Sequence, residues 1–291
     1  MSYGHLVRFV IKQLRTDCIS ISYNFKKSKL FSKRYTDFAV INTDDEYGKI
    51  LAKSINIDVK TYAINNKSAD FVADSIMQNS KGQSFVVDDL EYNINLAGRF
   101  NVSNALAVIV LLKHLGIDDL AIKQGLNTLE SVKGRFNAID VNGKLVIVDY
   151  AHTPDGLKNV LISCKEIADE KNGRVVVVFG CGGNRDTQKR PLMGEIASKH
   201  ADFSIITTDN PRFEKREAIA LDVEKGMVNK NYLIELDRAK AIKKAVDLAR
   251  VNDVILIAGK GAERYIDENG TKMPFSDLEE IEKYRRRCGI L

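Results

Sequence analysis

The sequence lacks the features of membrane and secreted proteins. None of its apolar runs approaches the roughly 20 residues that a membrane-spanning helix needs, and residues 1–5 do not begin a recognisable signal peptide. The four cysteines lie far apart and form no C-x-x-C pair, which disfavours a zinc ribbon or a disulfide framework. We therefore expect a cytoplasmic protein that does not associate with membranes.

Two nucleotide-binding fingerprints are also missing. No G-x-x-x-x-G-K-[ST] loop occurs in the chain, so no Walker-type loop is present to cradle nucleotide phosphates. The glycine run at residues 180–183 reads G-x-G-G and not G-x-G-x-x-G, which disfavours a nicotinamide-dependent oxidoreductase. With 44 basic and 39 acidic residues the chain is only weakly basic. We expect no nucleic-acid partner, whereas small anionic substrates suit this charge.

What is present is an alternation of strand-like and helix-like segments over 291 residues, enough for about two domains. In the first part we expect a strand at 37–42, a helix at 46–54, β-like runs at 59–64, 71–77, 84–87 and 92–96 that end in an antiparallel patch, and helices at 101–115 and 118–129. From Gly134 onward we expect strands at 145–148, 175–179, 203–207, 232–235 and 254–258, and helices at 155–168, 189–199, 217–225, 238–250 and 277–287. This pattern predicts a Rossmann-like, doubly wound parallel sheet covered on both faces.

Polar or glycine-rich turns follow four strands of the second part, at residues 149–152, 180–186, 209–212 and 259–263. Because parallel strands bring their carboxyl ends to one edge, we expect these turns to converge on a ligand site. Asp209, Asn210 and Arg212 suit a zwitterion, since Arg pairs with a carboxylate while Asp accepts from an ammonium group. An amino-acid substrate would fit.

Each turn also has a simpler interpretation that the residues leave open. The segment 209–212 is compatible with a surface turn, and His152 with the entry to a helix capped by Thr153. The glycine run is compatible with a tight turn, and the basic residues at 185–190 with a solvated helix start. Cations at a helix N-terminus oppose the helix dipole, however, and therefore favour an anionic ligand.

Taken together, these residues resemble the Mur ligase family from about Tyr23 to the C-terminus. The motifs of the first part are Y-x-x-x-K-x-x-L-F at 23–31, A-V-I-N-x-D-D at 39–45 and G-R-F-N-x-x-N-A at 98–105. Those of the second part begin with G-R-F at 134–136 and D-Y-A-H-T-P at 149–154. They continue with F-G-C-G-G-N-R-D at 179–186, K-R-P-L-M-G at 189–194, D-N-P-R at 209–212 and G-K-G at 259–261. The resemblance implies a partial central (ATPase) domain without its phosphate loop at 1–133, and a C-terminal Rossmann-like domain at 134–291.

The resemblance also implies a reaction. An ATP-dependent ligase activates a carboxylate of UDP-N-acetylmuramoyl-L-alanyl-D-glutamate to an acyl phosphate, which the amino group of the added residue attacks, with ATP and Mg²⁺ as cofactors. The D-N-P-R form is similar to that of members that add meso-diaminopimelate in peptidoglycan synthesis. Diaminopimelate has a distal carboxylate for Arg212 to clamp, and lysine has none.

Site residues follow position by position from the same resemblance. The diaminopimelate pocket would consist of Arg185, Asp209, Asn210, Pro211, Arg212, Gly259 and Glu263. The nucleotide side would include Asn104, Arg135 and Asp149, and catalytic roles would fall to His152 and to Lys27, which is carbamylated in the family and helps to hold a magnesium ion.

Three departures from the family pattern limit these expectations. The family's N-terminal UDP-sugar domain and its glycine-lysine phosphate loop have no counterpart here, and residues 2–22 do not resemble the family. Asn137 replaces a usual Glu, and Ala262 replaces a usual His. We therefore expect a truncated form with little or no activity alone. Two alternatives stay open: a non-catalytic remnant or amino-acid-binding module, and a partner chain that supplies a separately encoded N-terminal half.

Overall fold

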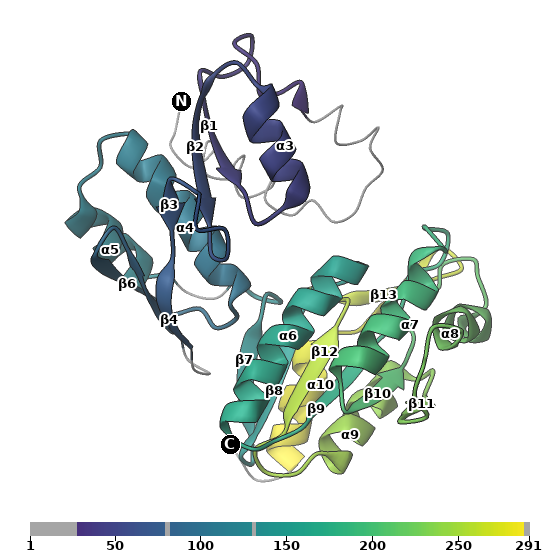
Figure 1. Ribbon diagram of the computed structural model, residues 1–291. Coiled ribbons are helices and arrows are strands. Elements are labelled where there is room, and N and C mark those ends of the chain that lie inside the picture. The colour runs from purple at the N-terminus through teal and green to yellow at the C-terminus, as the bar shows by residue number, and fades with distance from the viewer. Residues whose placement is uncertain (1–27, 79–81, 130–131, 288–291) are drawn as a thin grey trace. The chain divides into compact units, whose positions relative to one another are not determined.

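The computed structural model describes residues 28–78, 82–129 and 132–287 (Figure 1). Lys27 lies outside the described residues, so its predicted role stays a prediction. The chain divides into two compact units, Met1–Glu130 and Ser131–Leu291. Each unit has a hydrophobic core of its own.

The first unit combines a parallel and an antiparallel sheet of three strands each, in the orders β1-β2-β3 and β4-β5-β6. Its elements are β1 (Phe38–Asn42), α3 (Glu46–Ser54), β2 (Asp58–Ala63), β3 (Phe71–Val72), β4 (Asp74–Gln78), β5 (Gln83–Val87), β6 (Leu90–Ile94), α4 (Phe100–His114) and α5 (Asp119–Asn127). One core joins both sheets, because Tyr62 of β2, Phe85 of β5 and Tyr92 of β6 pack in one cluster with the buried residues of α4. The predicted antiparallel patch is confirmed.

The single β-run expected at residues 71–77 is wrong. It forms two strands in two sheets, because β3 pairs in parallel with β2 while β4 pairs antiparallel with β5. The Ala73 amide still donates to the carbonyl of Ala63, at 3.1 Å, and Ser75 then takes a positive φ of 50°. The backbone therefore leaves one sheet and enters the next within three residues, a bend that an apolar run does not reveal.

The second unit is built on a six-stranded sheet in the order β11-β10-β9-β12-β8-β7. Its elements are β7 (Asn137–Val141), β8 (Lys144–Asp149), α6 (Pro154–Glu170), β9 (Val175–Phe179), α7 (Lys189–His200), β10 (Phe203–Ile206), α8 (Arg216–Glu224), β11 (Tyr232–Ile234), α9 (Arg238–Leu248), β12 (Val254–Ala258), β13 (Tyr265–Glu268), β14 (Thr271–Pro274) and α10 (Asp277–Arg287). Neighbouring strands are parallel throughout, except that β7 pairs antiparallel with β8.

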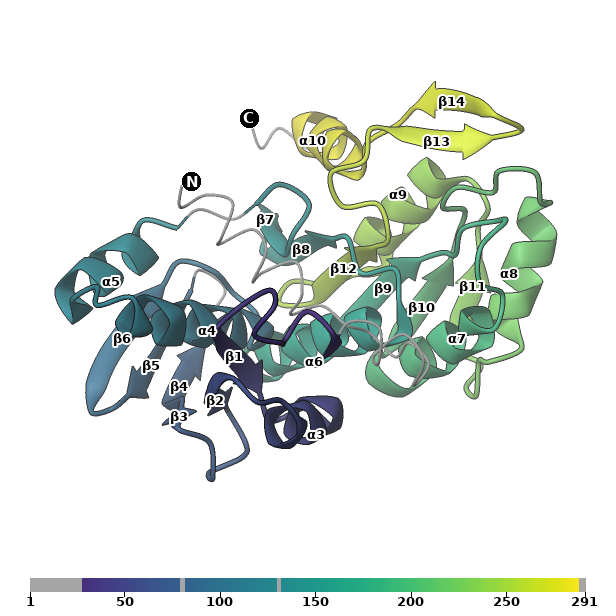
Figure 2. The ribbon, with the colours of Figure 1, turned by 90° about the horizontal axis from the view of Figure 1, so that it is seen from above.

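Helices cover both faces of this sheet, as the sequence predicts. The runs VVVVF of β9 and VILIA of β12 are buried at every residue, which is typical of strands with helices on both sides. Helices α6 and α7 lie on one face, and α9 and α10 lie on the other (Figure 2). The doubly wound α/β architecture is therefore confirmed.

Two features of the second unit are absent from the sequence-based expectation. Strand β7 extends the sheet antiparallel to β8, and β13 and β14 form a separate antiparallel hairpin. Neither has the continuous apolar run of a central strand, since β7 alternates between half-buried and exposed residues and β14 is exposed throughout. Among the described residues, no helix combines the length and apolar composition that crossing a membrane requires.

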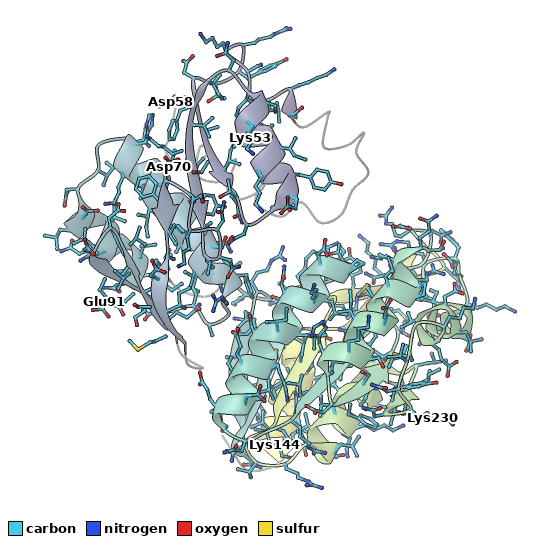
Figure 3. The ribbon with its side chains drawn as sticks, in the orientation of Figure 1. Lys53, Asp58, Asp70, Glu91, Lys144 and Lys230 are labelled. Atoms are coloured by element: carbon cyan, nitrogen blue, oxygen red, sulfur yellow. The ribbon has the colours of Figure 1, made fainter. Side chains whose placement is uncertain are left out.

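The parallel strands of the six-stranded sheet begin at one edge of the sheet and end at the opposite edge. Lys144, labelled in Figure 3, begins β8 at the amino edge, where its Nζ donates to the carbonyl of Val246 at 2.7 Å. The carboxyl ends of the parallel strands lie at the opposite edge, where the polar turns follow.

Candidate functional site

The four polar turns converge at the carboxyl edge of the six-stranded sheet. The strands that precede them, β10, β9, β12 and β8, are consecutive neighbours. The turns also touch directly, since the Gly183 amide donates to the Asn210 carbonyl at 2.9 Å and the Gly259 amide donates to the Asp149 carbonyl at 3.0 Å. The turns therefore meet at one edge of the sheet, as the sequence predicts, and Thr153 caps α6, as the simpler interpretation of the His152 turn also expects.

The turn of residues 209–212 is held against the β13–β14 hairpin. The Arg212 amide donates to the Asp267 carbonyl at 2.9 Å, and the Asn269 amide donates to the Arg212 carbonyl at 2.7 Å. Arg212 has a φ of +51°, a left-handed conformation that is uncommon for a residue with a long side chain. The hairpin therefore fixes the backbone from which the Arg212 side chain projects.

The Asn210 amide lies in a buried network with Lys260 and Glu263. Asn210 Oδ1 accepts from Lys260 Nζ at 3.0 Å and from the Asp267 amide at 2.9 Å, and Asn210 Nδ2 donates to Glu263 Oε2 at 2.9 Å. Two donors at the oxygen settle the orientation of the amide group. Both polar atoms of Asn210 are occupied, so Asn210 shapes the site through its neighbours.

Asp209 is 8% exposed, and its carboxylate makes no hydrogen bond or ion pair within the described part of the chain. Gly259, on the neighbouring turn, has a φ of +114°, and a Cβ there would lie 2.7 Å from Asp209 Oδ2. Only glycine leaves room for this carboxylate. A nearly buried carboxylate without a hydrogen-bond donor favours a cationic ligand group.

Two arginines flank the glycine-rich turn after β9. A Cβ placed on Gly182 would lie 2.9 Å from one guanidinium nitrogen of Arg212 and 3.8 Å from Cγ of Arg185. Arg212 donates to the Gly183 carbonyl at 2.8 Å, and its Nε lies 3.8 Å from Asp267 Oδ2. Arg185 is exposed and makes no ion pair among the described residues. Both side chains keep donors for an anionic ligand group.

Arg190 is not part of a solvated helix start, because its side chain is buried. It donates to Asp222 at 3.0 Å, to Glu214 at 3.0 Å and to the Gly182 carbonyl at 3.3 Å. Glu214 also accepts from the Asn184 amide. The carboxylates that pair with Arg190 are therefore supplied by the protein itself.

A second buried ion pair ties the strand ends together. Arg238, on α9, and Asp277, on α10, are fully buried and form two hydrogen bonds, at 2.7 and 2.9 Å. The Arg238 guanidinium also donates to the carbonyls of Thr208 and Ala258, at 3.3 and 2.9 Å. This pair fixes the ends of β10 and β12 relative to each other.

The residues expected on the nucleotide side of the second unit lie around Tyr150. The Asp149 carboxylate accepts from the amides of Phe136 and Ala151, at 2.9 and 2.7 Å, so it organises backbone. The Arg135 guanidinium lies over the Tyr150 ring at 4.6 Å. His152 is exposed, and its Nδ1 donates to the Tyr150 carbonyl at 2.9 Å.

A pocket of about 340 Å³ connects these groups to the buried network. Its lining residues are Lys133, Gly134, Arg135, Tyr150, Lys260, Ala262 and Glu263. Burial, and then the charge of Glu263, raise the pKa of Tyr150 above its usual value, so the hydroxyl stays protonated. The pocket lining therefore combines hydrogen-bond donors and cations with the carboxylate of Glu263.

Two of the expected site residues, Asn104 and Lys27, do not belong to the second unit. Asn104 lies in the first unit, in the middle of α4, where its Nδ2 donates to Asn101 Oδ1 at 3.3 Å. Lys27, with its expected magnesium ion, lies outside the described residues. Within residues 28–78, 82–129 and 132–287, no three His, Cys, Asp or Glu side chains are arranged to hold a metal ion.

Other candidate chemistry at this edge is limited. Cys181 follows β9, and burial raises the pKa of its thiol to about 12, which leaves it neutral and a poor nucleophile. The groups available to a ligand are therefore carboxylates and guanidinium groups placed close together. Carboxylates accept hydrogen bonds from ammonium groups, and guanidinium groups pair with carboxylates.

The sequence-based list missed Lys260, Arg238 and Asp277, whose buried side chains support the residues of the site. Burial lowers the pKa of Lys260, while the charge of Asp209 opposes that shift. Lysine and arginine are seldom fully buried, so a sequence pattern places them at the surface. The position of Lys260 directly after an apolar strand, between two glycines, was the available signal.

Two family models match the chain. The model of the Mur ligase middle domain matches residues 21–112, and the model of the Mur ligase, glutamate ligase domain matches residues 134–261. Similar curated proteins are named UDP-N-acetylmuramoyl-L-alanyl-D-glutamate--2,6-diaminopimelate ligases. The one from Clostridioides difficile is 44% identical over 267 residues, covering 88% of this chain and 54% of the relative. The one from Clostridium acetobutylicum is 40% identical over 271 residues, covering 90% of this chain and 55% of the relative.

Solved structures agree with these matches. A structure of a ligase with the same name superposes with a TM-score of 0.60 at 31% identity, covering 94% of this chain and 58% of that one. A pseudomurein peptide ligase type C from Methanothermus fervidus shares the fold, with a TM-score of 0.68 at 24% identity, over 91% of this chain and 60% of its own.

A doubly wound sheet with a mixed-charge carboxyl edge defines a ligand-binding α/β protein. The matches to both domain models, to the curated relatives and to the solved ligase make the identification specific: the chain belongs to the Mur ligase family. It spans about half the length of the curated relatives that it matches.

Proposed function

We propose that this chain is part of an ATP-dependent, amide-bond-forming ligase that adds meso-diaminopimelate to UDP-N-acetylmuramoyl-L-alanyl-D-glutamate in peptidoglycan synthesis. Residues 1–133 correspond in this proposal to the C-terminal part of the central domain, and residues 134–291 to the C-terminal domain. The names of relatives at 40% and 44% identity support the substrates. The reaction would take place in the cytoplasm.

The observation that carries the proposal is the pairing of opposite charges at the D-N-P-R turn. Asp209 offers a nearly buried carboxylate without a hydrogen bond in the described residues, and the side chains of Arg212 and Arg185 both lie close to Gly182. The distal end of meso-diaminopimelate carries one ammonium and one carboxylate group. A bidentate guanidinium suits the carboxylate, and the acids suit the ammonium.

Each pocket residue then has a defined task. Asp209 and the second oxygen of Glu263 accept from the ammonium group, while Arg212 and Arg185 donate to the carboxylate. Asn210 and Gly259 act indirectly, because Asn210 orients Glu263 and Gly259 leaves the space that the Asp209 carboxylate needs. Pro211 lacks an amide proton and restricts the turn between them.

The nucleotide side of the proposal assigns binding roles to Asn104, Arg135 and Asp149 and a catalytic role to His152. When bound, ATP supplies the phosphoryl group that activates the substrate carboxylate. Asp149 would act by ordering the backbone around Phe136 and Ala151, because both of its oxygens accept from amides there. His152 would accept a hydrogen bond at Nε2. The magnesium role of Lys27 rests on the resemblance of residues 23–31 alone.

Calorimetric titration of the 291-residue chain with meso-diaminopimelate and with L-lysine tests the pocket. We expect diaminopimelate to bind at least about tenfold more tightly, since a hydrogen bond between charged groups contributes roughly 1.5–3 kcal/mol and lysine lacks the distal carboxylate. Binding of neither amino acid, or a preference for lysine, would contradict the proposal. A chain that binds diaminopimelate, but forms no product even when a separately encoded N-terminal half is supplied, is the amino-acid-binding module that remains the second candidate.

A further inference from the structure

Lys260 is a fully buried cation that the proposed reaction does not use. It follows β12, and its side chain has no exposed surface. Its Nζ donates to Asn210 Oδ1 at 3.0 Å, to Glu263 Oε2 at 3.3 Å and to the Tyr265 carbonyl at 2.7 Å. These three acceptors satisfy the three protons of an ammonium group.

Lys260 balances negative charge that its neighbouring side chains carry. Asp209 and Glu263 are two carboxylates of the same site, and both interact electrostatically with Lys260. Arg212 does not replace Lys260, because Asp267 lies 3.8 Å from its Nε and partly balances it. The Arg238 guanidinium is balanced by Asp277. Lys260 is therefore a fully buried cation that contacts Glu263 directly and offsets part of the negative charge where the ligand's ammonium group would bind.

We propose that Lys260 is a specificity-determining residue, which sets the charge of the pocket so that it takes an amino acid with a zwitterionic distal end in preference to one with a cationic distal end. This inference rests on the proposed function. Lys260 acts through Glu263 and Asn210, and it is a positioning residue because its protons point at those side chains and not at the ligand.

The electrostatic consequence distinguishes the two ligands. The distal end of meso-diaminopimelate is neutral overall, whereas that of lysine carries one positive charge. Removing the Lys260 charge makes the pocket more negative by one unit, which favours lysine and leaves the attraction of diaminopimelate nearly unchanged. A loss of structure in the pocket would instead weaken the binding of both ligands equally.

Titration of Lys260→Met with meso-diaminopimelate and L-lysine measures this preference. We expect the ratio of the two dissociation constants to shift toward lysine by roughly tenfold, equivalent to about 1.4 kcal/mol. Lys240→Met is the matched control, because Lys240 is exposed on α9 and pairs with Asp237. Its ratio should equal that of the wild type. An unchanged ratio for a folded Lys260→Met would overturn the inference.

Glu263→Gln keeps the test decisive if Lys260→Met does not fold. It removes a negative charge beside Lys260 while retaining an oxygen acceptor, so the ratio should move in the opposite direction, further toward diaminopimelate. The double variant should return to the wild-type ratio. A Glu263→Gln ratio that stays constant or moves toward lysine refutes the inference. Wild-type protein that binds neither ligand, or prefers lysine, refutes the proposed function itself, and the inference falls with it.

Discussion

At the scale of single residues, the backbone of the site is held in conformations that most side chains avoid. Arg212 and Asn184 both have left-handed φ values, of 51° and 50°, on the two turns that carry the arginines. Such conformations cost on the order of 1–3 kcal/mol and persist where the surroundings impose them. Here hydrogen bonds from the hairpin hold Arg212, and Glu214 and Phe213 hold Asn184. These conformations bring the Arg212 guanidinium and the side-chain stem of Arg185 close to Gly182.

Replacing Arg212 tests whether its charge recognises the distal carboxylate. Arg212→Met should weaken binding of meso-diaminopimelate by roughly 10- to 100-fold, the range expected for a lost hydrogen bond between charged groups. Binding of L-lysine should change little, because lysine offers no carboxylate there. Lys215→Met, three residues further on and exposed, is the control for the loss of one positive charge. Equal losses for both amino acids would contradict this role of Arg212.

At the scale of secondary-structure elements, buried ion pairs set the positions of the strand ends. Arg238 and Asp277 have no exposed side-chain surface. Arg238 donates to the carbonyl of Thr208, just after β10, and to that of Ala258, the last residue of β12. Breaking such a pair is costly because it leaves one charge buried without a partner. The geometry of the turns at 209–212 and 259–263 thus depends on α9 and α10, which do not themselves carry ligand groups.

Arg238→Met should therefore lower the free energy of unfolding by about 3–5 kcal/mol. Urea unfolding followed by circular dichroism measures this change, since the chain contains no tryptophan for fluorescence. The double variant Arg238→Met/Asp277→Leu should recover a large part of the loss, because it removes the stranded carboxylate as well. A single variant as stable as the wild type would show that the pair does not support the strand ends.

The elements also show what could be predicted from the sequence. Strands such as VVVVF and VILIA are buried on both faces, so their composition alone identifies a parallel sheet and places the turns at one edge. Strand β7 and the β13–β14 hairpin were missed because exposed positions interrupt or replace their apolar residues. The residues that we propose to contact a ligand follow the strands directly, so they could be named from the sequence. Lys260, Arg238 and Arg190 were not assigned as buried supports, because pairing with distant acids, and not local pattern, buries them.

At the scale of the whole molecule, the proposed amino-acid pocket lies within one of the two units. The turns that would recognise diaminopimelate all belong to the unit Ser131–Leu291, which has its own core. A glycine-lysine phosphate loop occurs nowhere in the 291 residues. The chain spans about half the length of its curated relatives. Binding of the added amino acid and formation of the amide bond should therefore respond differently when the chain acts alone.

The isolated 291-residue chain should form little or no amide product from ATP, Mg²⁺, UDP-N-acetylmuramoyl-L-alanyl-D-glutamate and meso-diaminopimelate. Without donors placed around the transferred phosphoryl group, charge that develops in the transition state is not stabilised, and the loss of even one such donor costs roughly 100- to 1,000-fold in rate. Product formation followed by chromatography, with a ligase that carries the phosphate loop as positive control, measures this. Diaminopimelate binding by the same preparation confirms that its pocket is folded. Turnover comparable to the control would refute this prediction, because the chain would then handle phosphate with residues other than that loop.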